Sequence, residues 1–342
     1  MVTLSIDAMG GDAGLDVTLP GSKLFLQDVS DVDLILVGDK TRIQAKLNQY
    51  QLPSNRVTVR HAAEVISMAE NPLSALKNKK NSSMRLAVEL VKEGQAHAAV
   101  SAGNTGALIA ISKFVLKTLP GISRPALAKF LPGFKNRKVC ALDLGANIDC
   151  SAEHLLQFAI LASELCKSVK AVNPHPRVGL MNIGSEEGKG NEVAKQAFKL
   201  FSKTELNFVG NVEGNDLFSN KVDIIVCDGF VGNIMLKTME GSMRFVTTML
   251  KNEFEKNTFS RLVALAATPV FKQLKQELDP RYFNGANILG LNGIVVKSHG
   301  GTDALGFSFA LKEACQEART LKIDTLKSVI SEQLAKIDCS SI

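Results

Sequence analysis

Two lysines and one histidine of this chain lie in glycine-containing turns that directly follow strand-like segments. Lys297 and His299 come after the apolar run Ile294–Val296, and two glycines follow the histidine. Lys189 lies in a second turn, between Asn182 and Gly190. Ammonium groups bind and stabilise anions, and an imidazole gains or loses a proton near neutral pH. The lysines therefore favour an anionic substrate, and the histidine favours a reaction that includes a proton transfer.

The turn after the short apolar run Ala98–Val100 adds backbone groups to this chemistry. Its sequence is SAGNTGA, and the next residues carry apolar side chains at helical spacing. Asn104 or Thr105 would cap the first helical turn, while Gly103 and Gly106 leave the backbone open to a ligand. The free N–H groups of a helix N-terminus attract anions. Taken alone, this turn is as typical of an ordinary strand-to-helix connection as of a phosphate site.

Polar turns of the same kind follow several other strand-like segments. In a mostly parallel sheet the residues after the strands meet at one edge, where α/β proteins bind their ligands. We therefore expect one extended polar cleft rather than a set of unrelated tight turns. The predicted substrate- and phosphate-binding residues are Asp7, Gly10, Gly11, Asp12, Ser101, Asn104, Thr105, Asn147, Asn182, Glu187 and Lys297.

The motifs that the sequence lacks narrow the reaction. It contains no GxSxG elbow, no Walker-type phosphate loop, no GxGxxG after the first strand and no clustered His or Cys ligands. An enzyme that binds phosphate without a covalent nucleophile can use phosphate itself as the nucleophile, because phosphate needs orientation more than deprotonation. In this hypothesis Lys189 and Asn233 stabilise the oxyanion of a thioester carbonyl, and His299 protonates the departing thiolate. We expect no metal and no cofactor.

Strand-like and helical segments alternate along most of the chain. Val2–Ile6, Asp33–Val37 and Val139–Leu142 are typical strand-like runs, and helical patterns with periodic apolar faces lie between such runs. This alternation predicts a three-layer α/β/α sandwich with a mostly parallel sheet. No linker or repeat interrupts the pattern, so we expect residues 1–342 to form a single domain.

Two later segments do not follow this alternation. Phe230–Glu255 has the pattern of a long helix, and Phe259–Leu274 that of a second helix, which Pro269 should end or kink. We expect a protruding helical hairpin over residues 230–283. Its apolar face, bordered by Lys and Arg, either lies in a membrane interface or packs against a partner subunit. The predicted residues of this face are Phe259, Leu262, Val263 and Val270.

Composition and charge exclude several classes of protein. The chain has no tryptophan and two tyrosines, so recognition of nucleic acid by base stacking is not expected. Its formal net charge of +6 suits an acidic partner or an anionic membrane surface. No apolar run has the roughly 18 residues of a membrane-spanning helix. The six cysteines contain no CxxC pair and are expected to be free thiols, which together predicts a cytoplasmic protein.

A series of short motifs runs in order over nearly the whole chain. They are DAMGGD (residues 7–12), SAGNTGA (101–107), RPA (124–126), DLGAN (143–147), NIGxEExKG (182–190), GNVEG (210–214), CDGFxGN (227–233) and GLNGxVxKSHG (290–300). Each motif is modest by itself, whereas the ordered series is highly specific. The series resembles the PlsX family, the acyl-ACP:phosphate acyltransferases.

This resemblance implies a function, a fold and partners. It implies that acyl-acyl-carrier-protein (acyl-ACP) and inorganic phosphate are converted to acyl phosphate and free carrier protein for phospholipid (phosphatidic acid) synthesis. It also implies a homodimer whose fold is similar to that of phosphotransacetylases and isocitrate dehydrogenase-like enzymes. Peripheral membrane contact is implied as well, which favours exposure of the face of Phe259–Leu274 to a membrane or at the tip of the dimer. The acyl phosphate would then be handed to a membrane glycerol-3-phosphate acyltransferase.

Three other functions remain to be weighed against this one. A phosphotransacetylase would act on acyl-coenzyme A instead of acyl-ACP. A membrane-associated scaffold would bind acyl-ACP without turning it over. A dehydrogenase of the related fold is the weakest alternative, because the sequence carries no dinucleotide-binding fingerprint.

Overall fold

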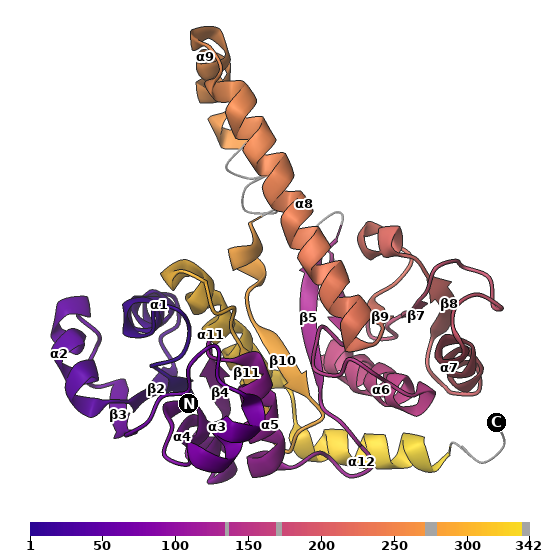
Figure 1. The fold of residues 1–342 in the computed structure, drawn as a ribbon, viewed down its shortest axis with the longest axis horizontal. Helices are drawn as coiled ribbons and strands as arrows, with labels where there is room; N and C mark the ends of the chain where they lie inside the picture. Colours follow the sequence, from indigo (N-terminus) through magenta and orange to yellow (C-terminus); the bar gives the residue numbers. More distant parts are fainter. Residues whose placement is uncertain (134–136, 169–172, 271–278, 337–342) are drawn as a thin grey trace.

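An 11-stranded sheet crosses the body of the computed structural model of this chain, and one long helix projects from that body (Figure 1). The structure describes residues 1–133, 137–168, 173–270 and 279–336. Helices cover both faces of the sheet, and most neighbouring strands are parallel. The predicted α/β sandwich with a mostly parallel sheet and a protruding helical segment is therefore confirmed.

The bounds of the elements are as follows. The strands are β1 (Val2–Asp7), β2 (Val32–Gly38), β3 (Val57–His61), β4 (Ala98–Ser101), β5 (Ala126–Pro132), β6 (Lys138–Leu142), β7 (Val178–Met181), β8 (Phe208–Val212), β9 (Ile224–Val226), β10 (Ala286–Leu289) and β11 (Ile294–Lys297). The helices are α1 (Leu15–Asp28), α2 (Lys40–Tyr50), α3 (Pro72–Asn78), α4 (Ser83–Lys92), α5 (Thr105–Leu116), α6 (Ala152–Ser168), α7 (Glu192–Ser202), α8 (Gly229–Glu255), α9 (Thr258–Ala266), α11 (Ala304–Thr320) and α12 (Ile323–Ala335), with short 3₁₀ helices at Gly214–Phe218 and Pro280–Phe283.

The strands of the sheet fall into two groups that run in opposite directions. Their order is β3-β2-β1-β4-β11-β10-β5-β6-β9-β7-β8. β1 to β4 and β11 are parallel to one another, and β10 is antiparallel to both β11 and β5. β6 is antiparallel to β5, and β7, β8 and β9 follow the direction of β6. The direction of β6 to β9 is therefore opposite to that of β1 to β4.

This reversal corrects the expectation that all the polar turns meet at one edge. The turns after β1, β4 and β11 follow strands of one direction, whereas those after β6, β7 and β9 follow strands of the opposite direction. Gly145, after β6, still lines one cavity with His299, whereas the residues directly after β7 do not. β10, which the sequence analysis did not predict, has only four residues. Because short apolar runs carry no clear period, such a strand is difficult to recognise in a sequence.

The two faces of the first strand group are covered by different helices. Leu4, Ile6 and Val100 pack in one cluster with residues of α1 and α11. Ala99 and Val295 belong to another cluster, together with residues of α4 and α5. Successive residues of a strand point to opposite faces, so these clusters lie on opposite sides of the sheet. The turns after β1, β4 and β11 are thereby held between two packed layers.

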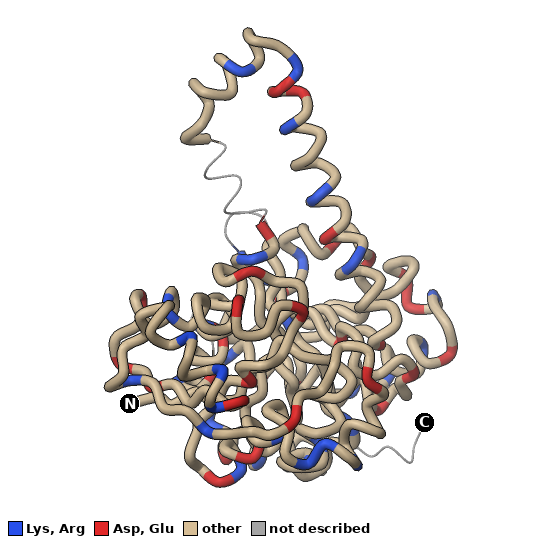
Figure 2. The backbone as a smooth tube through the Cα atoms, turned by 60° about the vertical axis from the view of Figure 1, so that its left-hand side comes forward, with Lys and Arg blue, Asp and Glu red and all other residues tan. Residues whose placement is uncertain are grey.

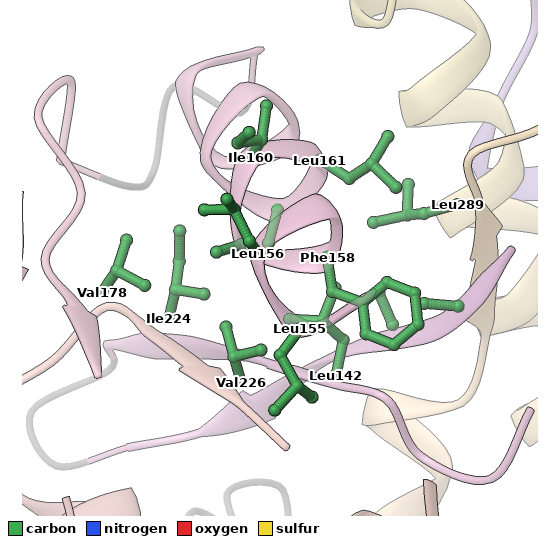
Figure 3. Close-up of a cluster of buried hydrophobic side chains, with 14 of the residues drawn as sticks. Leu142, Leu155, Leu156, Phe158, Ile160, Leu161, Val178, Ile224, Val226 and Leu289 are labelled. Carbon is green, nitrogen blue, oxygen red and sulfur yellow. The ribbon is translucent and has the colours of Figure 1, made fainter. Parts of the chain in front are cut away.

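Helix α6 forms the centre of the core of the second strand group. Figure 3 shows its side chains Leu155, Leu156 and Phe158 directed toward residues of neighbouring strands, including Val226 of β9. Most positions of α6 are buried, which fits a helix that is apolar around most of its circumference. Leu289 of β10 joins the same cluster, so the core is continuous across the reversal of the sheet.

Helix α8 leaves the body after its first turns. Leu236 and Met239 are buried at its base, whereas Phe245, Val246 and Met249 farther out are exposed. α9 follows at the outer end of α8 and has no buried residue (Figure 1). The predicted helix Phe230–Glu255 is confirmed by α8, and residues 271–278 of the predicted hairpin lie outside the described residues.

The projecting segment combines apolar and basic side chains. Phe259 and Leu262 of α9 are 76% and 61% exposed, and Val263 and Val270 are exposed as well. Figure 2 shows Lys and Arg spaced along this segment, with Asp or Glu beside them near its outer end. In the described part of the chain, no helix is both long and apolar enough to cross a membrane. The roles of this segment in dimer and membrane contact remain predictions.

Candidate functional site

A cleft of about 430 Å³ lies where the two strand groups meet, and we call it the central cleft. The turns after β1 and β11, the start of α5, the strand β5 and the base of α8 contribute its walls. β10 and β5 lie between β11 and β6 in the sheet, and residues from both strand groups, such as Lys297 and Gly145, line the cleft. Its polar lining residues are Asp12, Thr105, Lys129, Asn233, Lys237, Glu240, Asn284, Lys297 and His299.

His299 is held in one orientation by the turn that carries it. Its backbone N–H donates to Oδ1 of Asn284 at 3.0 Å, and its Nδ1 accepts from the backbone N–H of Gly301 at 3.2 Å. This acceptor role assigns the proton of the neutral ring to Nε2. Burial lowers the pKa of His299 below its ordinary value, and Lys237 acts in the same direction. A neutral imidazole with an Nε2–H donor therefore lies in the wall of the central cleft.

Lys297 provides a buried cation next to this histidine. Its side chain is almost fully enclosed, and Nζ donates to the carbonyl oxygens of Ala102 and Ser298. Burial lowers the pKa of Lys297 to about 8, although the negative charges of Asp7 and Asp12 act against this shift. The ammonium group is thus charged at neutral pH and close to losing its proton at mildly alkaline pH.

Two further lysines of the central cleft were missed by the sequence analysis. Lys129 of β5 lies 3.9 Å from Glu240 Oε1, and Lys237 donates to the other oxygen of Glu240 at 3.1 Å. Burial lowers the pKa of Lys129. A lysine is unusual inside an apolar run such as ALAKFLP, and this feature of the sequence could have identified Lys129 as a candidate functional residue. With Lys297, the cleft has more cationic than carboxylate groups in its lining.

Asp7 lies beneath the turns of the cleft and holds them together. Its two carboxylate oxygens accept hydrogen bonds from Ser83 Oγ at 2.6 Å and from Ser101 Oγ at 2.7 Å. Ser101 Oγ in turn accepts from the backbone N–H of Gly103 at 3.0 Å. Burial raises the pKa of Asp7, and the two serine hydrogen bonds oppose this shift. Asp7 and Ser101, predicted as ligand-binding residues, thus act here on the geometry of the turns.

The predicted glycines allow these turns to approach one another. A Cβ on Gly10 would come within 2.5 Å of the Asp7 carboxylate and 2.9 Å of the Gly103 nitrogen. Gly11 has a φ of +90°, and a Cβ there would lie 3.1 Å from the carbonyl oxygen of Gly300. Asp12, the next residue, donates its N–H to that same carbonyl oxygen. The turns after β1, β4 and β11 are therefore in direct contact, and Asp12 reaches the cleft.

Asn104 and Thr105 have different positions at the start of α5. Asn104 Oδ1 caps the helix by accepting from Ala107 N–H, and its Nδ2 donates to the carbonyl oxygens of Met68 and Glu70. The side chain of Asn104 thus fixes a neighbouring loop, whereas Thr105 lines the central cleft. Of the groups predicted to bind phosphate at this turn, Thr105 and the N-terminus of α5 are left, because the side chain of Asn104 is already hydrogen-bonded.

Asn147 joins the second strand group to the start of α8. Its Nδ2 donates to Pro125 O and to Asp143 Oδ2, both at 2.8 Å, and its carbonyl oxygen accepts from Gly229 N–H at 2.7 Å. Asp228 caps the helix by accepting from Val231 N–H. Asn233, near the start of α8, lies against Gly145 and lines the central cleft. Asn147 thus fixes the start of the helix that carries Asn233.

Lys189, Asn182 and Glu187 do not line the central cleft. Their turn follows β7, which is separated from β6 in the sheet by β9. The Lys189 side chain is 51% exposed and lies 3.9 Å from Glu186, and Glu187 is exposed. Asn182 donates to Lys189 O and borders a second cavity. The structure therefore unites Asn233 and His299 but not Lys189.

The described residues contain no cluster of His, Cys, Asp and Glu side chains that could hold a metal ion. Five cysteines, Cys140, Cys150, Cys166, Cys227 and Cys315, are free thiols, and Cys339 lies outside the described residues. The chemistry that the central cleft offers is that of a neutral imidazole donor, an amide, several ammonium groups and backbone N–H groups. Such a set of groups is chemically able to bind an anion and to stabilise a developing oxyanion.

The chain is similar to known proteins over almost its whole length. A family model described as "Fatty acid synthesis protein" matches residues 2–323. A "Phosphate acyltransferase" of Neisseria meningitidis serogroup A is 52% identical over 338 residues, covering 99% of this chain and 96% of the relative. A protein of the same name from Legionella pneumophila strain Paris is 47% identical over 335 residues, covering 97% of each chain.

Solved structures resemble this fold at much lower sequence identity. A phosphotransacetylase from Streptococcus pyogenes has a TM-score of 0.62 at 17% identity, covering 93% of this chain and 94% of the other. A branched-chain phosphotransacylase from Enterococcus faecalis has a TM-score of 0.60 at 15% identity, covering 94% and 100%. These likenesses confirm the predicted phosphotransacetylase-like fold. By the family model and the curated relatives together, the chain belongs to the fatty acid synthesis protein family, the PlsX acyltransferases.

Proposed function

We propose that this chain transfers a fatty acyl group from acyl-ACP to inorganic phosphate. The observation that carries the proposal is the central cleft, where His299, Asn233 and Lys297 line one cavity together with two further lysines. The names of the curated relatives state the same acceptor, phosphate. The acyl donor and the role in phospholipid synthesis are part of the proposal.

The reaction needs an oriented phosphate and a stabilised carbonyl oxygen. An oxygen of hydrogen phosphate attacks the thioester carbon, and the C–S bond breaks. Hydrogen phosphate loses one proton in this reaction, and the departing thiolate gains one, so the protons balance. The ammonium groups of Lys129, Lys237 and Lys297 favour a phosphate dianion in this cleft. Since phosphate is already anionic, holding it against the carbonyl supplies much of the catalysis.

Asn233 and His299 are the groups that we assign to the carbonyl and the leaving group. The amide of Asn233 donates to the oxyanion, and a helix N-terminus stabilises the same charge. The Nε2–H of His299 donates to the leaving sulfur and supplies its proton. The phosphate hydroxyl returns a proton to the ring, so the histidine is unchanged after each turnover.

The positive net charge of this chain favours acyl-ACP as the acyl donor. Acyl carrier proteins are strongly acidic in general, and this chain has a net charge of +6. An acyl-coenzyme A donor, as for phosphotransacetylases, is the alternative enzyme reaction. A scaffold that binds acyl-ACP without turnover is the non-catalytic alternative. It does not explain why the cleft contains the buried lysines Lys129 and Lys297, whose burial is unfavourable.

We propose that the projecting segment gives the enzyme a homodimer and a peripheral membrane contact. Phe245 and Met249 on α8 are exposed, and a second copy of α8 would cover such a face. The exposed apolar residues of α9 lie beside Arg261, a combination typical of helices in a membrane interface. A cytoplasmic enzyme at the membrane would hand acyl phosphate to a membrane glycerol-3-phosphate acyltransferase.

Release of carrier-protein thiol tests the proposed reaction. Hexadecanoyl-ACP is incubated with the full chain, with and without inorganic phosphate, and free thiol and hydroxylamine-reactive product are measured. Phosphate-dependent formation of both supports the proposal. Equal or greater activity with hexadecanoyl-coenzyme A would favour the phosphotransacetylase reaction. Tight binding of acyl-ACP without thiol release would favour the scaffold.

A further inference from the structure

A second cavity, of about 660 Å³, lies at the carboxyl ends of three neighbouring strands, β6, β9 and β7. The first turns of α6, α7 and α8 surround it and contribute Leu155, Val193 and Val231. Pockets of this size bury most of a drug-sized ligand. None of the proposed catalytic residues of the central cleft lines this cavity.

The second cavity differs from the central cleft in charge. Its described lining contains Asp149 and Asp228 but no lysine or arginine. Its two thiols are neutral, because burial raises the pKa of Cys150 to about 12 and that of Cys227 well above its ordinary value. Two carboxylates without a cation disfavour a phosphate or a nucleotide, even beside helix N-termini. The cavity suits a ligand without negative charge.

The walls and the rim of the second cavity are mainly apolar. Leu155, Leu180 and Val193 form part of its walls. At its rim, Ile148 and Ile183 are 67% and 83% exposed. Exposed apolar side chains around the mouth of a cavity mark a surface that binds an apolar group. The shape and chemistry of the cavity therefore fit a hydrocarbon chain.

The start of α8 separates the second cavity from the central cleft. Val231 lines the second cavity, and Asn233, two residues farther along, lines the central cleft. A Cβ on Gly229 would come within 2.6 Å of Asn147 O, so the helix and the turn below it are in direct contact. Phe230 and Ile234, four residues apart on one side of this helix, are both exposed. An apolar surface thus leads from one cavity toward the other.

We infer that the second cavity binds the hydrocarbon chain of the acyl donor. This inference rests on the proposed function, in which the thioester carbonyl lies beside Asn233 in the central cleft. From there the chain passes over Phe230 and Ile234 and enters the cavity at Ile148. Phosphate and the thioester group are then bound in the central cleft, on one side of the first turns of α8. The hydrocarbon chain is bound in the second cavity, on the other side.

Reducing the volume of the cavity tests the inference through chain-length preference. Val193→Phe places a larger side chain in the wall, and Val209→Phe makes the same change on β8 at an exposed residue outside both cavities. We expect Val193→Phe to lower the ratio of turnover with hexadecanoyl-ACP to turnover with octanoyl-ACP by at least about tenfold. Val209→Phe is expected to leave this ratio unchanged. An unchanged ratio in a folded Val193→Phe enzyme would overturn the inference.

A fluorescence measurement covers the case in which Val193→Phe does not fold. The chain has no tryptophan, so Ile183→Trp at the exposed rim provides a single emission reporter. Saturable binding of hexadecanoate should shift the emission to shorter wavelength, and octanoate should need a much higher concentration. If hexadecanoate leaves the emission unchanged, the cavity does not bind acyl chains. If the shift follows protein concentration instead, a second copy of the chain covers the cavity and the inference is wrong.

The two proposals fail in distinguishable ways. Phosphate-dependent thiol release with an unresponsive reporter and an unchanged chain-length ratio rejects the acyl-chain cavity and leaves the proposed reaction intact. A reporter that responds to hexadecanoate in a chain without thiol release rejects the reaction, while the cavity still binds an acyl chain.

Discussion

The imidazole Nδ1 of His299 accepts a hydrogen bond from the backbone N–H of Gly301, two residues farther along the same turn. This bond leaves the Nε2–H of the neutral ring as a donor in the central cleft. The orientation depends on a glycine-rich turn and on Asn284, whose side chain accepts from His299 N–H. The position of the donor is therefore set before any substrate binds.

His299→Ala is expected to lower turnover with acyl-ACP at least about tenfold, because general acid catalysis typically contributes this much or more. The fold should be intact, since His299 is an exposed residue of the cleft wall and does not belong to a hydrophobic cluster. Rates of thiol release and circular dichroism of both proteins test this. A folded His299→Ala enzyme with the wild-type rate would remove the histidine from the mechanism.

The pKa of Lys297, about 8, predicts an alkaline limit for phosphate binding. As pH rises through this value the lysine loses its charge, so the KM for phosphate should increase above about pH 8. In Lys297→Gln the KM should be high at pH 7 and should no longer rise with pH in this range. Changes in the charge of phosphate itself affect both enzymes equally. The same pH dependence in both enzymes would contradict the assignment.

Substitution of Lys189 distinguishes the mechanism expected from the sequence, in which Lys189 stabilises the oxyanion, from the arrangement in the structure, in which Lys189 lies outside the central cleft. From the sequence alone, we expect Lys189→Ala to lower turnover at least about tenfold, because a residue that stabilises the oxyanion contributes that much. In the structure this lysine lies outside the central cleft, whereas Lys129 lines it. The two alanine variants are compared by turnover and by KM for phosphate. A wild-type rate for Lys189→Ala, with a raised KM for Lys129→Ala, would transfer the cationic role to Lys129.

A buried carboxyl group that does not line the central cleft predicts a pH-dependent stability. Burial raises the pKa of Glu317 well above its ordinary value, and the neighbouring charge of Glu313 adds to this. Asn287 donates to Oε2, and Oε1 has no hydrogen-bond partner among the described residues. Because the folded state favours the protonated acid, its contribution to stability is present below the unfolded pKa and is lost as pH rises through the folded pKa.

Glu317→Gln imitates the protonated acid without titrating. The variant should have a higher free energy of unfolding than the wild type at pH 7 to 8, by about 1 to 3 kcal/mol, with the difference shrinking toward pH 4. Urea unfolding at several pH values measures this. A constant difference over the whole pH range would show that Glu317 is not the titrating group.

The exposed face of α9 predicts a loss of membrane binding when it becomes charged. Leu262→Glu combined with Val263→Glu should reduce the fraction bound to anionic phospholipid vesicles by about tenfold, because it removes apolar contact and adds negative charge. Val65→Glu, at an exposed apolar residue of the body, is the matched control. Vesicle sedimentation gives the bound fraction. Unchanged binding of the double variant would contradict the predicted membrane role.

Much of the central cleft could be predicted from local sequence. The turn chemistry after β1, β4 and β11 indicated Asp12, Thr105, Lys297 and His299, and the structure brings all of them to one cavity. This succeeded because parallel strands connected through helices carry their turns to a common edge. The long helix α8 was equally visible, because its apolar side chains recur at helical spacing over many turns.

The reversal of the sheet was decided by tertiary structure. β5 runs in the direction of β11, because β10 is antiparallel to both, and the antiparallel pair of β5 with β6 reverses the second strand group. The turn that carries Lys189 borders the second cavity rather than the central cleft. Pairing between strands distant in the chain depends on how whole layers pack, which no local pattern contains. The same pairing brings Lys129 to the cleft. By itself, the sequence determined the chemistry of each turn and the family, because these depend on residue type and order. The tertiary structure alone decided which turns share a cavity, because that depends on how strands and helices distant in the chain pack together.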